Sequence, residues 1–316
     1  MNSKFAPKQL ALLAEFLSRT YRPLVQLKEI IQKTAEFFKN KGIESGRLDA
    51  ELLIGSVLKL TRVELYLKFD YPLKESELDA CRELVKRRAA GEPVAYILGR
   101  RDFFKSTFIV SKDVLVPRPE TEELVEEALQ FAKAHEVTRI IDLGTGSGCI
   151  GLSLIKDLST ARLLAVDISE PALHIARQNA ASLQVQERAT FVQTDAGELS
   201  FEVTEQLLGG LADVIVANPP YISNNDTNVA PNVRAHEPAL ALFAENDGLR
   251  EIERWANVAG RVARAGALVM FEIGAEQGQK AREIFSNTGK FERIEIVKDL
   301  SGRDRFVRSF KGQEKG

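Results

Sequence analysis

The sequence predicts an α/β fold in which a parallel sheet, covered by helices on both faces, follows a small helical bundle. Between residues 24 and 90, apolar side chains recur every three or four positions, which indicates amphipathic helices. From residue 138 onward, short apolar runs alternate with helical patterns, which is typical of strands joined by crossover helices. A glycine-rich turn after the first of these runs predicts where a ligand binds.

Changes of pattern divide the chain into four segments. We expect an N-terminal extension over residues 1–20, with one helix near 8–18, and then a helical domain over 21–93. Residues 94–116 predict a linking β-hairpin, because the apolar residues there lose the helical period. Residues 117–316 form the larger, catalytic domain, whose first helix follows a Pro-Arg-Pro-Glu run.

The larger domain contains several candidate strands that alternate with helices. They lie at 139–143, 162–167, 190–193, 213–217 and 267–273. Because helices separate most of them, these strands are expected to run parallel. Two further candidates, 291–297 and 305–310, are joined by a loop without a helix, so we expect them to pair antiparallel.

Composition points to a folded protein of the cytoplasm. Of the 316 residues, 44% are hydrophobic and 28% are charged, and the formal net charge is -2, so we expect no direct nucleic-acid binding. The 2 cysteines and 3 histidines lack the spacing of a disulfide framework or a metal site, so no metal is expected. We also expect no signal peptide, no membrane partner and a monomeric chain.

A glycine-rich turn joins the first apolar strand to a helix. It consists of Gly144, Thr145, Gly146, Ser147 and Gly148. Glycines here permit a tight bend and a close approach of the backbone to a ligand. Asp167, at the end of the next strand, is placed to accept both hydroxyls of a ribose. Together these residues predict a site for an adenosine-containing cofactor.

Two features favour S-adenosylmethionine over a nicotinamide dinucleotide. Glycines at every second position differ from the GxGxxG spacing of dinucleotide sites, and Asp142 stands just before the first glycine. A carboxylate at the mouth of the site would repel a pyrophosphate, whereas it suits the ammonium of S-adenosylmethionine, directly or through water. Asp195, with Ala196 after it, is placed to approach the adenine, although an ordinary strand-end acid is an equal interpretation.

A buried strand ends in the tetrapeptide Asn218, Pro219, Pro220 and Tyr221. The two prolines restrict the backbone, so the Asn218 side chain and the Pro219 carbonyl present two neutral acceptors in a fixed arrangement. A primary amide or an aryl amine offers two N–H donors to such a pair, and Tyr221 adds an aromatic face. By itself the tetrapeptide leaves adenine, guanine and glutamine open as methyl acceptors.

With these residues, the sequence resembles the protein-(glutamine-N5) methyltransferases of the HemK/PrmC type. Members of that family methylate the glutamine of the Gly-Gly-Gln motif in peptide-chain release factors. The resemblance covers nearly the whole chain from about residue 24. It includes the segments 91–99, 116–122, 142–148, 218–221, 236–243, 247–249, 272–274 and 299–305.

The resemblance implies a class I, Rossmann-like methyltransferase domain with a seven-stranded sheet, S-adenosylmethionine as cofactor and a release factor as partner. It also implies that the glycine-rich turn and Asp167 bind the cofactor, that Pro219 to Tyr221 bind the glutamine, and that Asn218 lies near both. The run from Arg118 to Thr121 would close over the site, with Arg118 and Glu120 among the substrate-binding residues. The alternative is a helix cap with a structural ion pair.

Two departures from the family pattern are visible. Ala196 stands where the family often has a bulky residue, and Lys105 stands where the hairpin commonly has a glycine. Two related activities stay open, namely glutamine methylation of a ribosomal protein and methylation of an exocyclic amine in a nucleic acid. The glycine spacing disfavours an oxidoreductase, and the intact Asn218–Tyr221 motif disfavours a non-catalytic binding protein.

Overall fold

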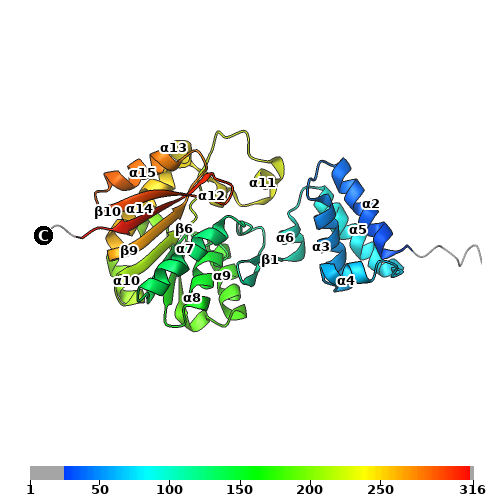
Figure 1. Ribbon diagram of the computed structural model, residues 1–316, viewed down its shortest axis with the longest axis horizontal. Coiled ribbons are helices and arrows are strands. Elements are labelled where there is room, and N and C mark those ends of the chain that lie inside the picture. The colour runs from blue at the N-terminus through cyan, green and yellow to red at the C-terminus, as the bar shows by residue number, and fades with distance from the viewer. Residues whose placement is uncertain (1–24, 314–316) are drawn as a thin grey trace, which may run out of the picture. The chain divides into compact units, whose positions relative to one another are not determined.

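The structure, a computed structural model, describes residues 25–313 and divides into two compact units at Leu98 (Figure 1). The expected extension over 1–20, with its helix near 8–18, lies outside the described residues. In the first unit the chain is helical, as its apolar periodicity predicts. Its helices are α2 (Leu27–Asn40), α3 (Gly46–Leu58), α4 (Arg62–Leu67), α5 (Glu75–Ala89) and α6 (Val94–Leu98).

The short helix α6 occupies the start of the segment that we expected to form a hairpin. Its first turn begins at Pro93, whose carbonyl accepts hydrogen bonds from the backbone N–H groups of Tyr96 and Ile97. Proline favours this start, because its ring presets the helical φ and its missing N–H has no partner in a first turn. The hairpin itself is shorter than expected and pairs β1 (Arg100–Phe103) with β2 (Ser106–Ile109).

The hairpin turn bears on the unusual lysine of the sequence. The residue with left-handed backbone there is Phe104, with a φ of 52°, and Lys105 follows it. The Lys105 ammonium pairs with Asp157 and lies 5.0 Å from the centre of the Phe104 ring. The turn therefore forms without a glycine, and Lys105 is held against its neighbours.

The second unit is built on a seven-stranded, mostly parallel sheet, which confirms the predicted fold class. The strand order is β10-β11-β9-β6-β3-β4-β5, and only β11 runs antiparallel to its neighbours, β10 and β9. The strands are β3 (Arg139–Leu143), β4 (Arg162–Asp167), β5 (Ala189–Gln193), β6 (Ala212–Ala217), β9 (Ala263–Glu272), β10 (Phe291–Lys298) and β11 (Asp304–Lys311). All seven predicted strand segments are thus present in the sheet.

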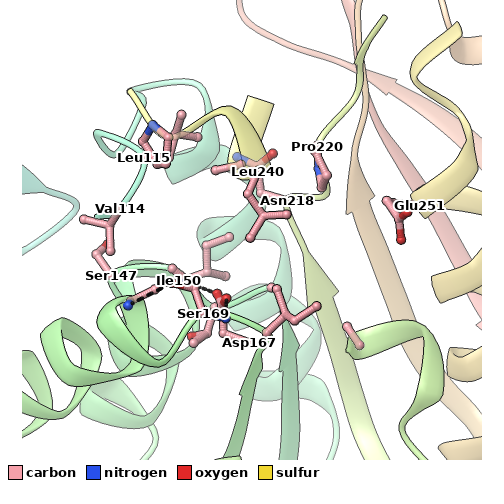
Figure 2. Close-up of a pocket in the computed structure, with 18 of the residues that line it drawn as sticks. Val114, Leu115, Ser147, Ile150, Asp167, Ser169, Asn218, Pro220, Leu240 and Glu251 are labelled. Atoms are coloured by element: carbon pink, nitrogen blue, oxygen red, sulfur yellow. Dashed lines mark hydrogen bonds between the residues drawn. The ribbon is translucent and has the colours of Figure 1, made fainter. Parts of the chain in front are cut away.

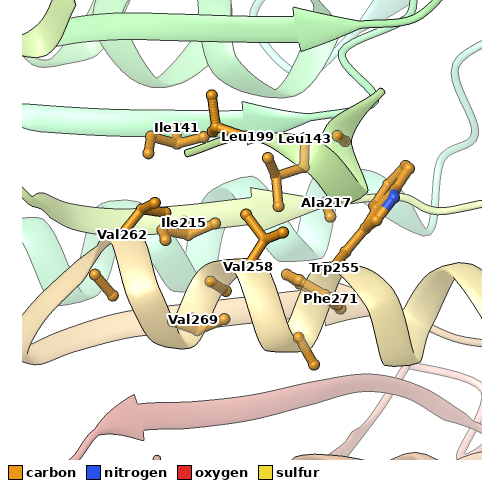
Figure 3. Close-up of a cluster of buried hydrophobic side chains, with 14 of the residues drawn as sticks. Ile141, Leu143, Leu199, Ile215, Ala217, Trp255, Val258, Val262, Val269 and Phe271 are labelled. Carbon is orange, nitrogen blue, oxygen red and sulfur yellow. The ribbon is translucent and has the colours of Figure 1, made fainter. Parts of the chain in front are cut away.

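Helices cover both faces of this sheet and bury a separate apolar core against each (Figure 1). One face packs against α7 (Thr121–Ala134), α8 (Cys149–Asp157) and α9 (Glu170–Ser182), and the other against α10 (Phe201–Leu208), α14 (Arg250–Val262) and α15 (Gly278–Asn287). In the second core, Val258 and Val262 of α14 lie against Ile215 of β6 (Figure 3). Burial on both faces explains why the central strands are continuous apolar runs.

Short elements fill the connections near the carboxyl ends of the strands. They are η1 (Gln186–Arg188), η2 (Ala196–Glu198), β7 (Ile222–Ser223), α11 (Pro231–His236), α12 (Ala239–Leu242), β8 (Phe243–Ala244) and α13 (Glu245–Gly248). Strand β7 pairs in parallel with β8, which brings the segment after the tetrapeptide beside the segment that follows α12. No helix in the described chain is both long and apolar enough to cross a membrane.

One buried asparagine ties the hairpin to the glycine-rich turn. Asn179 of α9 is fully buried, and its Oδ1 accepts a hydrogen bond of 2.7 Å from Ile109 N. Its Nδ2 donates to Ile109 O at 3.0 Å and to Ser147 O at 2.8 Å. The amide thus satisfies three backbone groups, and it links β2 to the turn that begins α8.

We expect Asn179→Ala to lower the free energy of unfolding by about 1–3 kcal/mol, because buried backbone groups lose their partners. Asn179→Asp should also destabilise the protein, since a carboxylate accepts from Ile109 N but has no proton for either carbonyl. The exposed neighbour Gln178 provides the control as Gln178→Ala. Urea denaturation measures all three, and equal midpoints for Asn179→Ala and the control would contradict the assigned role.

Candidate functional site

The candidate site lies at one edge of the sheet, where the parallel strands end. Strand β3 has β4 on one side and β6 on the other, and the chain reaches these two neighbours by crossovers in opposite directions. Ligands in such sheets bind in the crevice outside the carboxyl ends at this reversal of strand order. A cavity of about 340 Å³ lies there, within the second unit (Figure 2). This volume falls within the range of small-molecule pockets.

The cavity gathers most of the residues expected to bind ligands. Those lining it are Arg118, Gly144, Thr145, Gly146, Ser147, Asp167, Asp195, Ala196, Asn218 and Pro220. Five others are not among its lining residues, namely Glu120, Asp142, Gly148, Pro219 and Tyr221. Most of the residues that the sequence predicts as ligand-binding therefore line one cavity, whereas these five lie outside its lining.

Asp142 lies beneath the glycine-rich turn and not at the mouth of the site, where we expected it. Its side chain is fully buried, and Oδ2 accepts hydrogen bonds from Thr145 Oγ1 at 2.7 Å and Gly151 N at 3.1 Å. Its Oδ1 has no hydrogen-bond partner among the described residues. Burial raises the pKa of Asp142 to about 7. The carboxyl group therefore holds the turn from below and keeps one free acceptor.

Asp167 ends β4 and lines the cavity directly. Its Oδ2 accepts from Gly146 N at 2.8 Å, and its Oδ1 accepts from Ser169 N at 2.9 Å. Burial is the main cause that raises its pKa, and these backbone hydrogen bonds oppose the rise. Each oxygen retains a lone pair, so the carboxylate has acceptors for two hydroxyl groups of a ligand.

The backbone at Gly144 approaches an aromatic side chain that the sequence did not single out. Gly144 has a φ of +69°, and a Cβ built on it would lie 2.5 Å from Cη2 of Trp255. Trp255, on α14, lines the cavity, and its Nε1 has no hydrogen-bond partner among the described residues. It is the only tryptophan in the chain, so its fluorescence reports on this cavity alone.

The two residues expected near an adenine follow β5. Asp195 accepts from Gly197 N at 2.8 Å and from Arg254 Nη2 at 2.7 Å, so part of its acceptor capacity serves the local fold. Ala196 begins η2, is buried, and packs in the core beneath. Both residues line the cavity, whose wall on this side also includes Glu251 (Figure 2).

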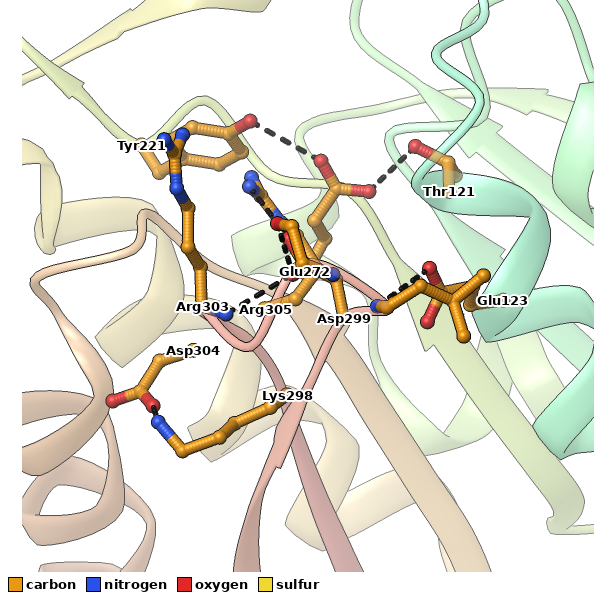
Figure 4. Close-up of polar contacts among 11 residues, drawn as sticks. Thr121, Glu123, Tyr221, Glu272, Lys298, Asp299, Arg303, Asp304 and Arg305 are labelled. Atoms are coloured by element: carbon orange, nitrogen blue, oxygen red, sulfur yellow. Dashed lines mark hydrogen bonds and ion pairs between the residues drawn. The ribbon is translucent and has the colours of Figure 1, made fainter.

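The end of β6 presents Asn218 to the cavity and turns Tyr221 away from it. Asn218 Nδ2 donates to Thr121 Oγ1 at 3.4 Å. The Tyr221 hydroxyl donates to Glu272 Oε1 at 3.2 Å, and the same carboxylate accepts from Thr121 (Figure 4). Burial and the nearby Glu272 raise the pKa of Tyr221, so the phenol stays protonated. The backbone carbonyl of Tyr221 accepts from Gln277 Nε2 at 2.9 Å.

Gly248 explains why the segment after α12 can pack so closely against the tetrapeptide. Its φ is +79°, and a Cβ there would lie only 1.9 Å from Tyr221 O. A side chain at this position would therefore displace the backbone of Tyr221. Gln277 links the tetrapeptide to the segment after α12, because its Nε2 donates to Asp247 O at 3.0 Å as well as to Tyr221 O.

Of the run expected to close over the site, Arg118 and Thr121 line the cavity. Arg118 lines it and pairs with Glu237 at 2.6 Å, while Glu237 Oε2 also accepts from Val116 N at 3.1 Å. Glu120 instead lines a separate surface groove with Glu122 and other acids. An ion pair therefore holds the run before α7 to Glu237, as the alternative interpretation expected, but no side-chain cap hydrogen bond is made at the start of α7.

Four residues of the site were not assigned a role of their own by the sequence. Thr121, Glu237, Trp255 and Glu272 come from four separate segments, and only packing brings them to the strand ends. Glu272 and Glu237 lie in runs that resemble the family, yet nothing in their spacing predicts their partners. Within residues 25–313, no group of histidine, cysteine and acidic side chains is arranged to hold a metal ion.

The residues present fit S-adenosylmethionine. Asp167 has free acceptors for the ribose hydroxyls, and the buried Oδ1 of Asp142 is an unused acceptor next to the turn. The charged side chains that line the cavity have nearly balanced signs, which suits a ligand that carries a carboxylate, an ammonium and a sulfonium. They are Asp113, Arg118, Asp167, Asp195, Arg250, Glu251 and Arg254.

Comparisons with known proteins agree with this geometry. Residues 29–99 match a family model described as the PrmC N-terminal domain, and residues 122–242 match one described as a methyltransferase small domain. The release factor glutamine methyltransferase of Rhodopirellula baltica is 37% identical over 288 residues, which cover 88% of this chain and 94% of that relative. Its counterpart from Chlorobaculum tepidum is 38% identical over 283 residues, with 88% and 94% covered.

A solved structure shares the fold at low sequence identity. The hMettl16 catalytic domain aligns with a TM-score of 0.53 and 17% identity, covering 74% of this chain and 82% of that chain. At this identity the likeness concerns the fold alone. It agrees with the seven-stranded, mostly parallel sheet described above.

The buried carboxyl of Asp142 predicts a specific dependence of stability on pH. Its pKa rises from the ordinary 3.8 to about 7 on folding, so between these values the folded state binds a proton that the unfolded state lacks. We therefore expect the free energy of unfolding to fall, through this group, as pH rises across that range. In Asp142→Asn this contribution is absent, and the amide oxygen still accepts from Thr145 and Gly151.

Denaturation of both proteins from acid to neutral pH measures the effect. Other buried carboxyls, such as Asp167, titrate in both proteins, so the difference between the two curves isolates Asp142. That difference should increase toward neutral pH in favour of the variant. Parallel curves would show that Asp142 is ionised normally in the folded protein.

Proposed function

Because the chain belongs to the release factor glutamine methyltransferase family, we propose that it methylates the glutamine of the Gly-Gly-Gln motif in peptide-chain release factors. The methyl group of S-adenosylmethionine would be transferred to the side-chain amide nitrogen, N5. One observation carries the proposal beyond the family name. Asn218 lines the same cavity as Asp167 and the glycine-rich turn, so donor and acceptor groups can meet there.

Residues at one end of the cavity are suited to the cofactor. When bound, S-adenosylmethionine supplies an electrophilic methyl group on a sulfonium. Asp167 would accept the ribose hydroxyls, the backbone of Gly144 to Gly148 would lie against the ligand, and Asp195 with Ala196 would border the adenine. The free Oδ1 of Asp142 would attract the ammonium from beneath the turn, directly or through water.

At the other end of the cavity, Asn218 and its neighbours are suited to a primary amide. An amide nitrogen is a poor nucleophile, because its lone pair is delocalised into the carbonyl. The Asn218 side-chain oxygen and the Pro219 carbonyl would accept the two N–H groups, orient the nitrogen and stabilise the positive charge that develops on it. Positioning of this kind contributes up to about 7–11 kcal/mol in well-oriented systems. Pro220 would complete the glutamine site, and Tyr221, turned away from the cavity, would hold this segment in place through its hydrogen bonds to Glu272 and Gln277.

The helical unit would hold the release factor outside the cavity. The helix with the most Lys and Arg residues, α5, is a weak candidate for nucleic-acid binding, because its cations pair with neighbouring acids. The pairs are Arg82 with Glu75 and Asp79, Lys86 with Glu83, Arg87 with Glu92 and Arg88 with Asp49. We propose that the protein acts as a monomer in the cytoplasm, where release factors work, without membrane or direct nucleic-acid binding.

A labelling assay tests the acceptor. With methyl-labelled S-adenosylmethionine, we expect label on a release factor and none on a factor whose Gly-Gly-Gln glutamine is replaced by alanine. A ribosomal protein fraction and adenine-containing DNA serve as parallel acceptors, because the two related activities share the catalytic chemistry. Equal labelling of the two release factors, or label only on another acceptor, would refute the assigned target.

Two substitutions test the division of roles within the cavity. We expect Asn218→Ala to abolish transfer while largely sparing cofactor affinity, because its side chain is assigned to the acceptor. Asp167→Ala should weaken cofactor binding instead, since it removes the acceptors for the ribose. Fluorescence of Trp255 measures cofactor binding without turnover. A main loss of cofactor affinity in Asn218→Ala would contradict this assignment.

A further inference from the structure

We propose that Thr121 and Glu272 are positioning residues that fix which end of the Asn218 amide faces the acceptor nitrogen. The inference rests on the proposed function, because it concerns how the acceptor is held. It assigns a task to the Pro-Arg-Pro-Glu-Thr-Glu run, whose threonine is nearly fully buried at the start of α7.

The Asn218 amide has two ends of nearly equal size and opposite function. Its oxygen accepts hydrogen bonds, whereas its NH₂ group only donates them. If the amide oxygen of Asn218 faces the cavity, it accepts a hydrogen bond from an N–H of the acceptor. If the NH₂ group faces the cavity, two hydrogen-bond donors face each other. The cavity therefore works only if the surrounding structure selects one orientation.

Glu272 is the origin of the selection. It ends β9, beside β6, and only 1% of the residue is exposed. When ionised, a carboxylate accepts hydrogen bonds and donates none. Its Oε2 lies 2.6 Å from Thr121 Oγ1, and its Oε1 lies 3.2 Å from the Tyr221 hydroxyl. The hydroxyl groups of Thr121 and Tyr221 must therefore both donate their hydrogen bonds to Glu272 (Figure 4).

The direction of the Thr121 hydrogen bond determines which end of the Asn218 amide faces Thr121. Because its only hydroxyl proton points to Glu272, its oxygen faces the other way as an acceptor. The nearest group of Asn218 is the NH₂, at 3.4 Å, which donates to that oxygen. The amide oxygen of Asn218 then faces the cavity that this residue lines. The carboxylate thus orients the amide through one intervening hydroxyl.

The pKa of Glu272 lies above its ordinary value, because burial outweighs the contacts that favour the ionised form. Three of these contacts oppose the rise. Burial raises the pKa of Glu272, while the Thr121 hydroxyl, the positive charge of Arg305 and the Tyr221 hydroxyl lower it. Arg305, on β11, is itself paired with Asp299 at 3.1 Å, and its positive charge lowers the pKa of Glu272 electrostatically. Glu120 opposes this effect through its negative charge.

An ordinary helix-capping role does not account for Thr121. The N-cap of α7 is Glu120, and no side-chain cap hydrogen bond is made there. Thr121 is instead the first residue of the helix, and its hydroxyl points to a carboxylate 151 positions further along the chain. The hydroxyl therefore belongs to the site and not to the helix start.

The test compares Thr121→Val with Thr121→Ser. Valine keeps the shape of threonine and removes the hydroxyl, whereas serine keeps the hydroxyl and removes a methyl group. We expect Thr121→Val to lower kcat at saturating acceptor by about 10- to 100-fold, less than the loss of a group that itself contacts the reacting atoms, and Thr121→Ser to retain most of it. Cofactor affinity, followed by Trp255 fluorescence, should stay at the wild-type value in both variants.

A second variant covers the case in which Thr121→Val does not fold. In Glu272→Gln, the new NH₂ group can donate to Thr121, which frees the threonine proton for the Asn218 oxygen and removes the selection. We expect its kcat to fall as well, with unchanged cofactor affinity. Wild-type kcat in Thr121→Val or in Glu272→Gln would overturn the inference, as would an equal loss in Thr121→Ser, which would indicate packing alone.

These outcomes are separable from failure of the proposed function. If the wild-type protein labels a ribosomal protein or DNA and no release factor, the assigned target is wrong. Any planar N–H₂ acceptor still needs an acceptor atom from Asn218, so the same three variants are then compared on the labelled substrate. The positioning role of Thr121 and Glu272 is upheld or refuted by that comparison alone.

Discussion

The parallel register of the central strands is the constraint on which the site depends. Leu143 at the end of β3 pairs with Val166 of β4 and with Ala217 of β6, and Ala217 pairs in turn with Phe271 of β9. The glycine-rich turn begins one residue beyond Leu143, and Asp167, Asn218 and Glu272 are each one residue beyond these partners. A shift of one residue would reverse which face each side chain points to, so the register sets the whole constellation.

Buried carboxyl groups connect this register to chemistry. Asp142, Asp167 and Glu272 lie at the ends of adjacent or nearby strands, where burial raises the pKa of each. Each is held by hydroxyl or backbone N–H groups, which is how a fold keeps acidic groups in a poorly solvated place. Buried carboxyl groups destabilise a hydrophobic core. They occur most often at functional sites, where a ligand can bind to their free oxygen lone pairs. These buried carboxyl groups thus lower local stability and provide hydrogen-bond acceptors in fixed orientations.

Sequence reasoning succeeded where one local pattern decides the outcome. Apolar runs located all seven strands, and glycine and proline chemistry located the turn after β3 and the tetrapeptide after β6. It failed for residues 94–98, because a proline-started helical turn and a short strand have similar apolar content. It also put Asp142 at the mouth of the site, since sequence position does not tell which face of a strand end a side chain occupies.

The sequence by itself determined the fold class, the family, and the two strand ends where cofactor and acceptor residues stand, because these follow from periodicity and short motifs. Only the tertiary structure decided that Trp255 packs on Gly144, that Arg118 pairs with Glu237, and that Thr121 and Glu272 meet beside Asn218. These contacts join segments far apart in the chain. Their partners are chosen by strand order and helix packing, which no local pattern of residues encodes.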